Sequence, residues 1–416
     1  MTQPSAPKIA IACGGTGGHL FPGLAVAEQL VKRGCAVTLL VSPKEVDQQA
    51  VKSALVLGAS MSVVTLPSVG LQNRNYFSFG ISFLKSQIAA RRVFRGQNVN
   101  AALAMGGFTS APPILAAKQL GAKTFLHESN TIPGKANRWL SRFVNECFVG
   151  FPQAAARLRN RHVTVTGTPV RPQFQPRNAA ACRAALGLDP ALPTILVMGG
   201  SQGATGINDL ILKALDYFKD GRARLSERAA SSSAAPNDLQ FFHLTGPADA
   251  DKVRRAYAEK NLRATVHPFF GEMDLALGAA TVAVSRSGAS SLAELAAMRV
   301  PSLLVPFPAA TDNHQFFNAK AFADTGAARL LEQKAATPES AAQMIWELIA
   351  DAAVREKMQS ALAQWHAPLA AEQIAETMLK LMAQETEHVN PKLKGANGGC
   401  GCGGEHRAEL RADTAL

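Results

Sequence analysis

The chain has 416 residues, of which 47% are hydrophobic and 18% charged, so it carries enough apolar side chains for two buried cores. It contains no run of 18 apolar residues, which predicts that no helix spans a membrane. The polar lead before the first apolar run is too short for a secretion signal.

The net charge of +12 is concentrated in residues 1–170, which hold 18 Lys and Arg but only 5 Asp and Glu. No carboxylate occurs between Asp47 and Glu128. A surface this basic attracts phospholipid, nucleic acid or polyphosphate. The basic half shows no helix-turn-helix, zinc or RNA-recognition pattern, so we expect no nucleic-acid partner.

Cysteine usage favours a reduced, cytosolic protein, because four of the six cysteines stand singly in apolar or helical surroundings. These four are Cys13, Cys35, Cys147 and Cys182. Cys400 and Cys402 lie in a Gly-rich tail that offers too few ligands for a metal site.

The first half begins with the pattern of a βαβ unit. An apolar run at 8–13 is followed by GGTGGH, by a segment of helical periodicity that stops at Gly34, and by the apolar run AVTLLVS. Such a Gly-rich turn places backbone N–H groups at a helix N-terminus, where phosphate binds. AALAMGG then repeats the strand and turn before a helix with Pro112 and Pro113 in its first turn, and KTFLHESN is a further strand.

The pattern restarts after the Pro-rich segment VTVTGTPVRPQFQPRN. PTILVMGGSQGATG opens a second series of apolar runs, continued by QFFHLTG, ATVHPFF, VAVSRSG and SLLVPFP. We therefore expect two doubly wound α/β domains that face each other across a cleft. The expected division is a domain at 1–166, a linker at 167–190, a domain at 191–385 with an exposed insert at 221–238, and a disordered tail at 386–416.

The segment from residue 71 to 96 combines apolar and basic side chains. Phe77, Ile81, Leu84 and Ile88 form one helical stripe. The stripe would suit packing on its own domain, but it cannot also bury the additional phenylalanines Phe79, Phe83 and Phe94. We therefore favour a patch that lies on an anionic bilayer, consisting of Phe77, Ile81, Leu84, Lys85, Arg91, Arg92 and Arg95.

Two common nucleotide-binding classes do not fit. A dinucleotide fingerprint requires a small residue where Leu20 stands and an acidic residue at the end of the second strand, which instead ends at Ser42. The GxxxxGK[ST] loop of many ATPases is also missing.

The motifs GGTGGHLFPGLAVA, MGGFTSAPP, HESN, GGSQGA, SRSGASSLAE and PFPAATDNHQFFNA follow one another between about residues 8 and 380. Together they resemble the MurG family of glycosyltransferase family 28. The resemblance implies a GT-B fold of two Rossmann-like domains and transfer of GlcNAc from UDP-GlcNAc to the MurNAc 4-hydroxyl of lipid I, with inversion and without a metal or other cofactor. The product would be lipid II, for peptidoglycan synthesis, cell shape and cell division.

The resemblance also implies a peripheral protein on the cytoplasmic side of the cell inner membrane, whose N-terminal domain takes the lipid acceptor. The implied partners are UDP-GlcNAc, lipid I, an anionic membrane surface and other cell-wall synthesis proteins.

His19 matches the family's general base, and Glu128 is the second candidate. A helix N-terminus favours the neutral, proton-accepting imidazole, which can take the proton of the attacking hydroxyl. The alternative is that His19 only caps its loop.

Further positions match the donor site of the family. Asn130 would hold the GlcNAc hydroxyls, Arg171 the phosphate side and Gln315 the donor sugar, with Asp312 in support. Ser201 would contact the diphosphate, although a Ser there also suits a helix cap.

The nucleotide would lie against the second domain. The backbone of Phe270 would read uracil and Glu294 would accept the ribose hydroxyls. The remaining matched positions are Thr16, Gly17, Gly18, Ala289, Ser290, Ser291, Leu292 and Ala293.

Ser129 stands where the family commonly has Gln, and the insert and the cysteine-bearing tail are additions. Three other functions stay open: a related UDP-sugar-dependent lipid glycosyltransferase, a non-catalytic UDP-sugar or lipid-binding scaffold, and a UDP-GlcNAc 2-epimerase of the same fold.

Overall fold

A computed structural model describes residues 6–15, 17–43, 60–67, 76–200, 203–219 and 239–388. Thr16, Ser201, the insert at 221–238 and the cysteines of the tail lie outside these residues. Among the residues described, no helix combines the length and apolar character needed to cross a membrane.

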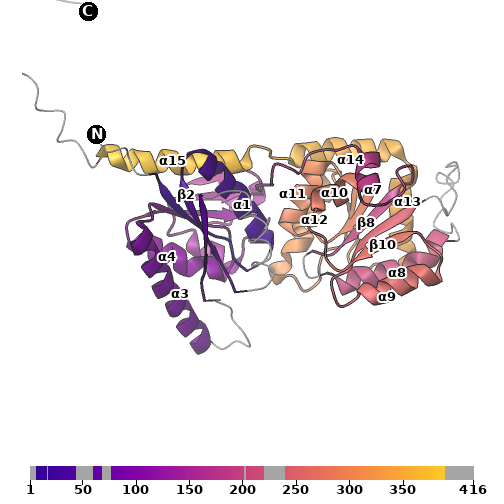
Figure 1. The fold of residues 1–416 in the computed structure, drawn as a ribbon, viewed down its shortest axis with the longest axis horizontal. Helices are drawn as coiled ribbons and strands as arrows, with labels where there is room; N and C mark the ends of the chain where they lie inside the picture. Colours follow the sequence, from indigo (N-terminus) through magenta and orange to yellow (C-terminus); the bar gives the residue numbers. More distant parts are fainter. Residues whose placement is uncertain are drawn as a thin grey trace, which may run out of the picture.

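The first domain is a parallel sheet in the order β3-β2-β1-β4-β5-β6-β7 (Figure 1). Its strands are β1 (Lys8–Ala12), β2 (Ala36–Val41), β3 (Met61–Thr65), β4 (Ala101–Ala104), β5 (Lys123–Glu128), β6 (Glu146–Val149) and β7 (Val163–Val165). Its helices are α1 (Gly17–Lys32), α3 (Tyr76–Gln97), α4 (Ala111–Gln119), α5 (Lys135–Leu140) and α6 (Pro152–Ala155), with a 3-10 turn η1 (Phe108–Ser110). The order reverses between β1 and β4, where ligands bind in doubly wound folds.

The second domain repeats this topology, in the order β10-β9-β8-β11-β12-β13. Its strands are β8 (Thr194–Met198), β9 (Gln240–Leu244), β10 (Ala264–His267), β11 (Val282–Ser285), β12 (Ser302–Leu304) and β13 (Arg329–Leu330). Its helices are α7 (Ala179–Ala185), α8 (Thr205–Lys219), α9 (Ala250–Glu259), α10 (Met273–Ala279), α11 (Ala289–Met298), α12 (His314–Asp324), α13 (Pro338–Ala350) and α14 (Ala352–Trp365), with a 3-10 turn η3 (Thr311–Asn313). The prediction of two doubly wound domains is confirmed.

The central strands are buried along their whole length, as expected for parallel strands covered by helices on both faces. The turn after β1 requires glycine, because a Cβ on Gly14 would lie 2.3 Å from the backbone nitrogen of Ser42. This absence of a side chain lets the turn lie directly against the end of β2. Cys13, Cys35, Cys147 and Cys182 are buried and form no disulfide with one another, as the sequence predicts.

The structure divides the chain differently from the expected boundaries. Helix α15 (Ala370–His388) returns to the first domain, where Ile374 and Met378 complete the core beside α1 (Figure 1). Arg33 on the α1 side reinforces the contact through ion pairs of 2.8 and 3.0 Å with two glutamates of α15. The second domain therefore ends near residue 365 rather than 385.

The expected linker at 167–190 is also too long. Phe174, Cys182 and Leu188 are buried in the core of the second domain, and Arg183 of α7 donates to the carbonyl of Ala279 at 2.9 Å. Helix α7 thus packs against α10 as part of the second domain, so the connection between the domains is short.

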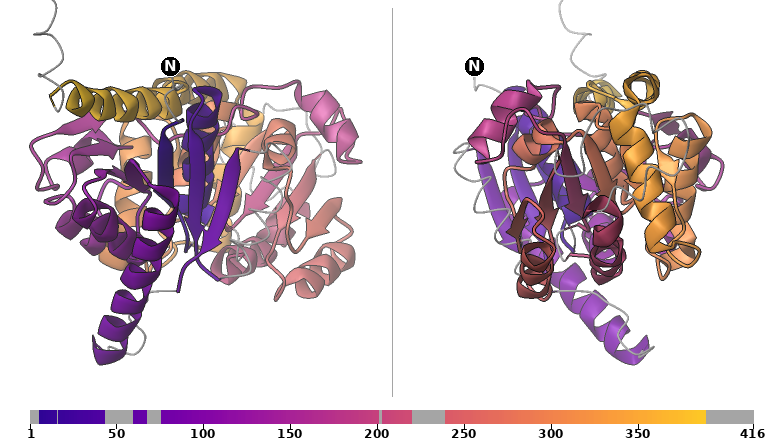
Figure 2. Two further views of the ribbon diagram at one scale, coloured as in Figure 1. Left: turned by 60° about the vertical axis from the view of Figure 1, so that its left-hand side comes forward. Right: turned by 90° about the vertical axis from the view of Figure 1, so that its right-hand side faces the viewer.

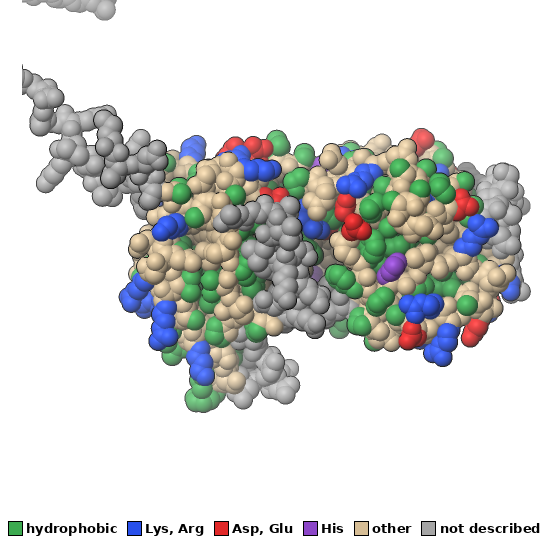
Figure 3. Space-filling model, in the orientation of Figure 1, with side chains coloured by type: hydrophobic (Ala, Val, Ile, Leu, Met, Phe, Trp, Pro, Cys, Tyr) green, Lys and Arg blue, Asp and Glu red, His purple; other side chains and the backbone are tan. Residues whose placement is uncertain are grey.

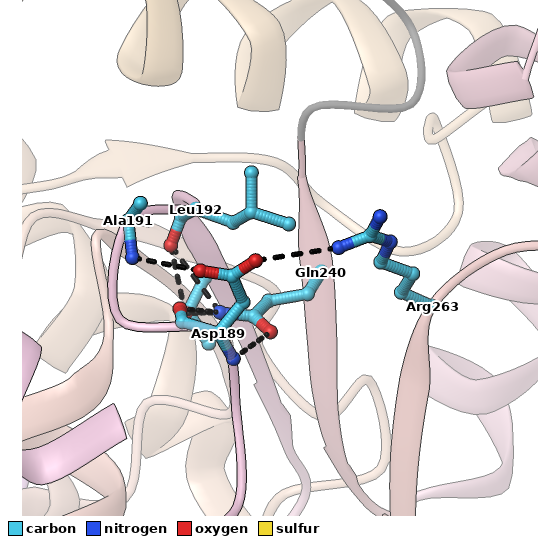
Figure 4. Close-up of polar contacts among 6 residues, drawn as sticks. Asp189, Ala191, Leu192, Gln240 and Arg263 are labelled. Atoms are coloured by element: carbon cyan, nitrogen blue, oxygen red, sulfur yellow. Dashed lines mark hydrogen bonds and ion pairs between the residues drawn. The ribbon is translucent and has the colours of Figure 1, made fainter. Parts of the chain in front are cut away.

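A buried glutamine, Gln240, stands at the amino end of β9 and bonds to the loop before β8 (Figure 4). The Gln240 amide donates to the carbonyl of Asp189 at 2.7 Å and accepts from the backbone nitrogen of Asp189 at 3.0 Å. The Asp189 carboxylate lies 3.4 Å from Arg263 at the surface. This cluster lies at the end of the sheet opposite the candidate site.

Candidate active site

His19 lies in the first turn of α1, and its ring rests against the second Gly-rich turn. A Cβ on Gly106 would be 2.8 Å from His19 Nε2, and one on Gly107 would be 3.3 Å from its Cε1. Both glycines have positive φ, +122° and +78°. The two glycine motifs, almost ninety residues apart, therefore form one surface around the imidazole.

Hydroxyl groups hold these two turns together. Thr109 Oγ1 donates to the carbonyl of Gly14 at 2.9 Å, and Ser110 Oγ lies 3.1 Å from the carbonyl of Ala12 and 2.6 Å from that of Gly106. Both hydroxyls belong to the MGGFTSAPP motif. These hydrogen bonds from hydroxyls to backbone carbonyls fix the two turns against each other, and thereby the surroundings of His19.

Glu128, at the carboxyl end of β5, is buried and receives four hydrogen bonds. Its Oε1 accepts from the backbone and side-chain nitrogens of Asn130 at 2.9 and 3.0 Å, and its Oε2 accepts from Gly134 N at 3.0 Å and Asn137 Nδ2 at 2.8 Å. Burial raises the pKa of the carboxyl, and the four donors oppose that rise. These hydrogen bonds hold the loop of residues 128–137 in place and fix the orientation of the Asn130 side chain.

His127 links the same loop to the start of the interdomain connection. Its Nε2 lies 3.1 Å from the carbonyl of Gly167, and its Nδ1 lies 3.2 Å from Ser129 Oγ. Burial lowers the pKa of His127 to about 4, so the ring is neutral at physiological pH. The unusual Ser129 of this chain is therefore a partner of a buried histidine.

The domains meet at the carboxyl ends of both sheets. Ser290 Oγ, in the first turn of α11, donates to the carbonyl of Gly18 at 2.9 Å. At the rim, Arg138 of α5 forms a 2.7 Å ion pair with Asp312. The segment that matches the donor site therefore faces the turn that carries His19.

The segment Ala289–Glu294 lies in α11, and Glu294 is partly buried there. Burial raises the pKa of Glu294 to about 7, against the opposing influence of Arg171. The Arg171 guanidinium is centred 4.5 Å from the Phe21 ring and 5.1 Å from the Phe174 ring. Its buried Nε has no hydrogen-bond partner among the described residues. Arg171 thus lies between the domains, close to the carboxylate expected to bind ribose.

Side chains of the remaining donor positions are anchored by the second domain. Gln315 Oε1 accepts from the backbone nitrogen of Phe307 at 2.9 Å. The Phe270 ring packs edge-on against Phe242, with 5.2 Å between centroids. Arg286 donates to the carbonyls of Val305 and Pro306 after β12 at 2.9 and 3.1 Å, which fixes the turn that follows this strand.

Asn318 of α12 is a residue that sequence reasoning missed. It is fully buried, and its amide contacts both Thr131 and Asn130 of the first domain. An Asn between the apolar residues Phe317 and Ala319 could have signalled an inward-facing polar group.

The apolar stripe of α3 does not pack on its own domain. Phe77, Ile81, Leu84 and Ile88 are 80%, 42%, 56% and 44% exposed. The helix projects from the body of the domain (Figure 2), and basic side chains border its apolar end (Figure 3). A different face is buried, and it includes Phe94. The interpretation of the stripe as core is therefore wrong, and an exposed apolar and basic surface remains.

Comparison with known proteins identifies the family of both domains. Residues 9–149 match the glycosyltransferase family 28 N-terminal domain, and residues 194–374 match the glycosyltransferase family 28 C-terminal domain. UDP-N-acetylglucosamine–N-acetylmuramyl-(pentapeptide) pyrophosphoryl-undecaprenol N-acetylglucosamine transferases are similar over most of the chain. The protein from Synechococcus elongatus is 35% identical over 90% of this chain and 99% of its own length. That from Myxococcus xanthus is 32% identical over 91% and 94%.

Solved structures share the fold. The crystal structure of Acinetobacter baumannii MurG has a TM-score of 0.66 and 27% identity, and the match covers 90% of this chain and 99% of that one. A putative UDP-N-acetylglucosamine 2-epimerase from Listeria monocytogenes reaches a TM-score of 0.65 at 15% identity over 92% of this chain and 98% of its own, a likeness of fold alone. The chain belongs to glycosyltransferase family 28, within its MurG group of N-acetylglucosamine transferases.

Proposed function

We propose that the protein transfers GlcNAc from UDP-GlcNAc to the MurNAc 4-hydroxyl of lipid I, releasing UDP and forming lipid II. The observation that carries this proposal is the position of His19. It lies on the surface made by two Gly-rich turns, and the bond from Ser290 to Gly18 brings the donor segment of α11 against the same turn. The proposed proton acceptor and the proposed nucleotide segment would thus lie on opposite sides of one junction.

In the proposed reaction, His19 accepts the proton of the MurNAc 4-hydroxyl as that oxygen attacks C1 of GlcNAc from the face opposite UDP. The bond between C1 and the diphosphate oxygen breaks with inversion, and the electron pair leaves with UDP. Glu128, whose oxygens already receive four hydrogen bonds, orients Asn130 toward the sugar. For these reasons His19 is favoured over Glu128 as the base.

The departing diphosphate needs positive potential. The N-termini of α1 and α11 supply oriented N–H groups, and Arg171 supplies a cation near Glu294. Glu294 would accept the ribose hydroxyls, and the anchored Gln315 and Phe270 would contact the sugar and the uracil. Thr16 and Ser201 remain proposed diphosphate contacts from the family motif.

Membrane attachment is part of the proposal. The exposed stripe and bordering cations of α3 suit insertion into the headgroup region of an anionic bilayer, which would bring the acceptor domain to lipid I on the cytoplasmic side. Contacts with other cell-wall synthesis proteins remain a suggestion of the family resemblance.

The test is UDP release with a short-chain lipid I analogue. UDP-GlcNAc should support turnover, and UDP-Gal should support far less. Preference for UDP-Gal would indicate a related lipid glycosyltransferase. Epimerised UDP-sugar without acceptor would indicate an epimerase. Donor binding without any UDP release from UDP-GlcNAc or UDP-Gal would favour a scaffold and overturn the proposal.

A further inference from the structure

The side-chain amide of Asn318 connects the two domains through four contacts. Its Oδ1 accepts from Thr131 N and Thr131 Oγ1, both at 2.9 Å, and its Nδ2 donates to Asn130 Oδ1 at 3.0 Å and to the carbonyl of Ser287 at 3.1 Å. These contacts use both hydrogens and both lone pairs of a primary amide. Since Asn318 is fully buried, no water competes for them.

The partners of Asn318 are the backbone segments that carry groups of the proposed site. Ser287 precedes α11, which bears Glu294, and its hydroxyl donates to the carbonyl of Gln315 at 2.7 Å. Thr131 directly follows Asn130 on the other domain. One amide therefore fixes the distance between the segments of Thr131 and Ser287, which lie in different domains and far apart in the sequence.

Asn318 also fixes the orientation of Asn130. Asn130 Nδ2 donates to Glu128, and Asn130 Oδ1 accepts from Asn318. An amide tied at both ends has one rotamer and one assignment of oxygen and nitrogen. Loss of Asn318 would free the oxygen end and allow the Asn130 side chain to turn.

From this geometry we propose that Asn318 is a positioning residue, which aligns the sugar-binding Asn130 with the donor segment across the domain junction. The inference rests on the proposed transfer reaction. It differs from a purely structural role, in which Asn318 would stabilise the fold without affecting the reacting geometry. Displacement of reacting groups by about 1 Å can lower the rate about 100-fold, whereas loss of stability alone leaves the folded fraction fully active.

The test uses full-length protein with N318A and N318D. Asp keeps the acceptor for Thr131 but loses the donor to Asn130 and Ser287, so both variants should lose about 100-fold in kcat. The affinity for UDP, measured by titration calorimetry, should change less than threefold. T131V retains the backbone N–H and removes one donor, so it should lose about tenfold or less.

The matched control is Q240A, which removes another buried amide of the second domain, at the amino end of its sheet and away from the candidate site. It should lower Tm at least as much as N318A, yet keep kcat within twofold when assayed well below Tm. N318A or N318D with wild-type kcat would overturn the inference. So would a Q240A loss of kcat equal to that of N318A.

A second readout does not depend on turnover. Spin labels at the exposed positions Gln153 and Glu259, introduced as cysteines in a background without Cys400 and Cys402, report the interdomain distance by pulsed EPR. N318A should broaden the distance distribution of the UDP complex, and Q240A should not. If wild-type protein released no UDP with lipid I but this broadening occurred, the proposed reaction would fail while the alignment by Asn318 would stand. An unchanged distribution would refute the alignment.

Discussion

Replacement of Phe77, Ile81 and Leu84 by Ser tests the membrane surface. Together these three side chains expose slightly less than the equivalent of two complete apolar side chains. Full burial of one such side chain is worth about 1.5–3 kcal/mol, so insertion of this stripe could contribute about 3–5 kcal/mol. Because an interfacial helix inserts only part of each side chain, we expect about 2–3 kcal/mol, which corresponds to roughly 30- to 150-fold weaker partitioning.

The assay is sedimentation with liposomes that contain anionic phospholipid. The triple variant should bind 30- to 150-fold more weakly, while UDP affinity and Tm remain near wild type because the changed residues are exposed. V165S together with L369S removes apolar side chains that are similarly exposed outside α3 and should leave liposome binding unchanged. Wild-type partitioning of the triple variant, or equal loss in this control, would refute the membrane assignment of the stripe.

Three other predictions concern the site and the stability of the second domain. H19A should lower kcat about 10²- to 10⁴-fold with UDP affinity retained. G106A should also lower kcat, because its Cβ would displace the His19 ring. Full turnover of H19A would exclude His19 as the base. The carboxyl of Glu294 has its pKa raised to about 7, and it must be ionised to accept the ribose hydroxyls. KM for UDP-GlcNAc should therefore rise about tenfold as pH falls from 8 to 6, and E294Q should remove this pH dependence. An unchanged pH profile in E294Q would assign the pH dependence to another group. Q240A should lower the free energy of unfolding by about 2–4 kcal/mol in urea titrations, because it truncates a buried side chain and removes its hydrogen bonds to the part-buried backbone groups of Asp189. R263A should cost less than about 0.5 kcal/mol, because it removes a surface pair of 3.4 Å; equal losses would contradict this reasoning.

The fold could be predicted because its signals are local. The strands β1 and β8 are short apolar runs, each followed directly by glycines, and such runs are typical of buried parallel strands before a phosphate-binding turn. The stop of α1 was also visible, since Gly34 adopts φ +80° just after the helix. The motifs predict His19 at the start of a helix and Gly106 in a turn after a strand, and both predictions hold. That the two are in contact is visible only in the folded structure.

Long-range partners could not be predicted from the same patterns. The apolar positions of α15 indicate a helix with a buried face, but periodicity does not say which domain covers that face. For α3 the pattern suited two faces, and burial of Phe94 rather than the Phe77 stripe decided between them. Asn318 resembles an ordinary polar helix residue in the sequence, because its partners Asn130 and Thr131 lie more than 180 residues away on the other domain.

The return of α15 also determines the order in which the protein can fold during synthesis. The second domain is formed mainly by the continuous stretch of residues 174–365, so most of its side chains can pack as soon as that stretch has left the ribosome. The first domain is made earlier but lacks Ile374 and Met378 until α15 emerges. Until then the side of α1 that packs on α15 lacks its partner, so a nascent chain arrested before α15 is the species we expect chaperones to bind.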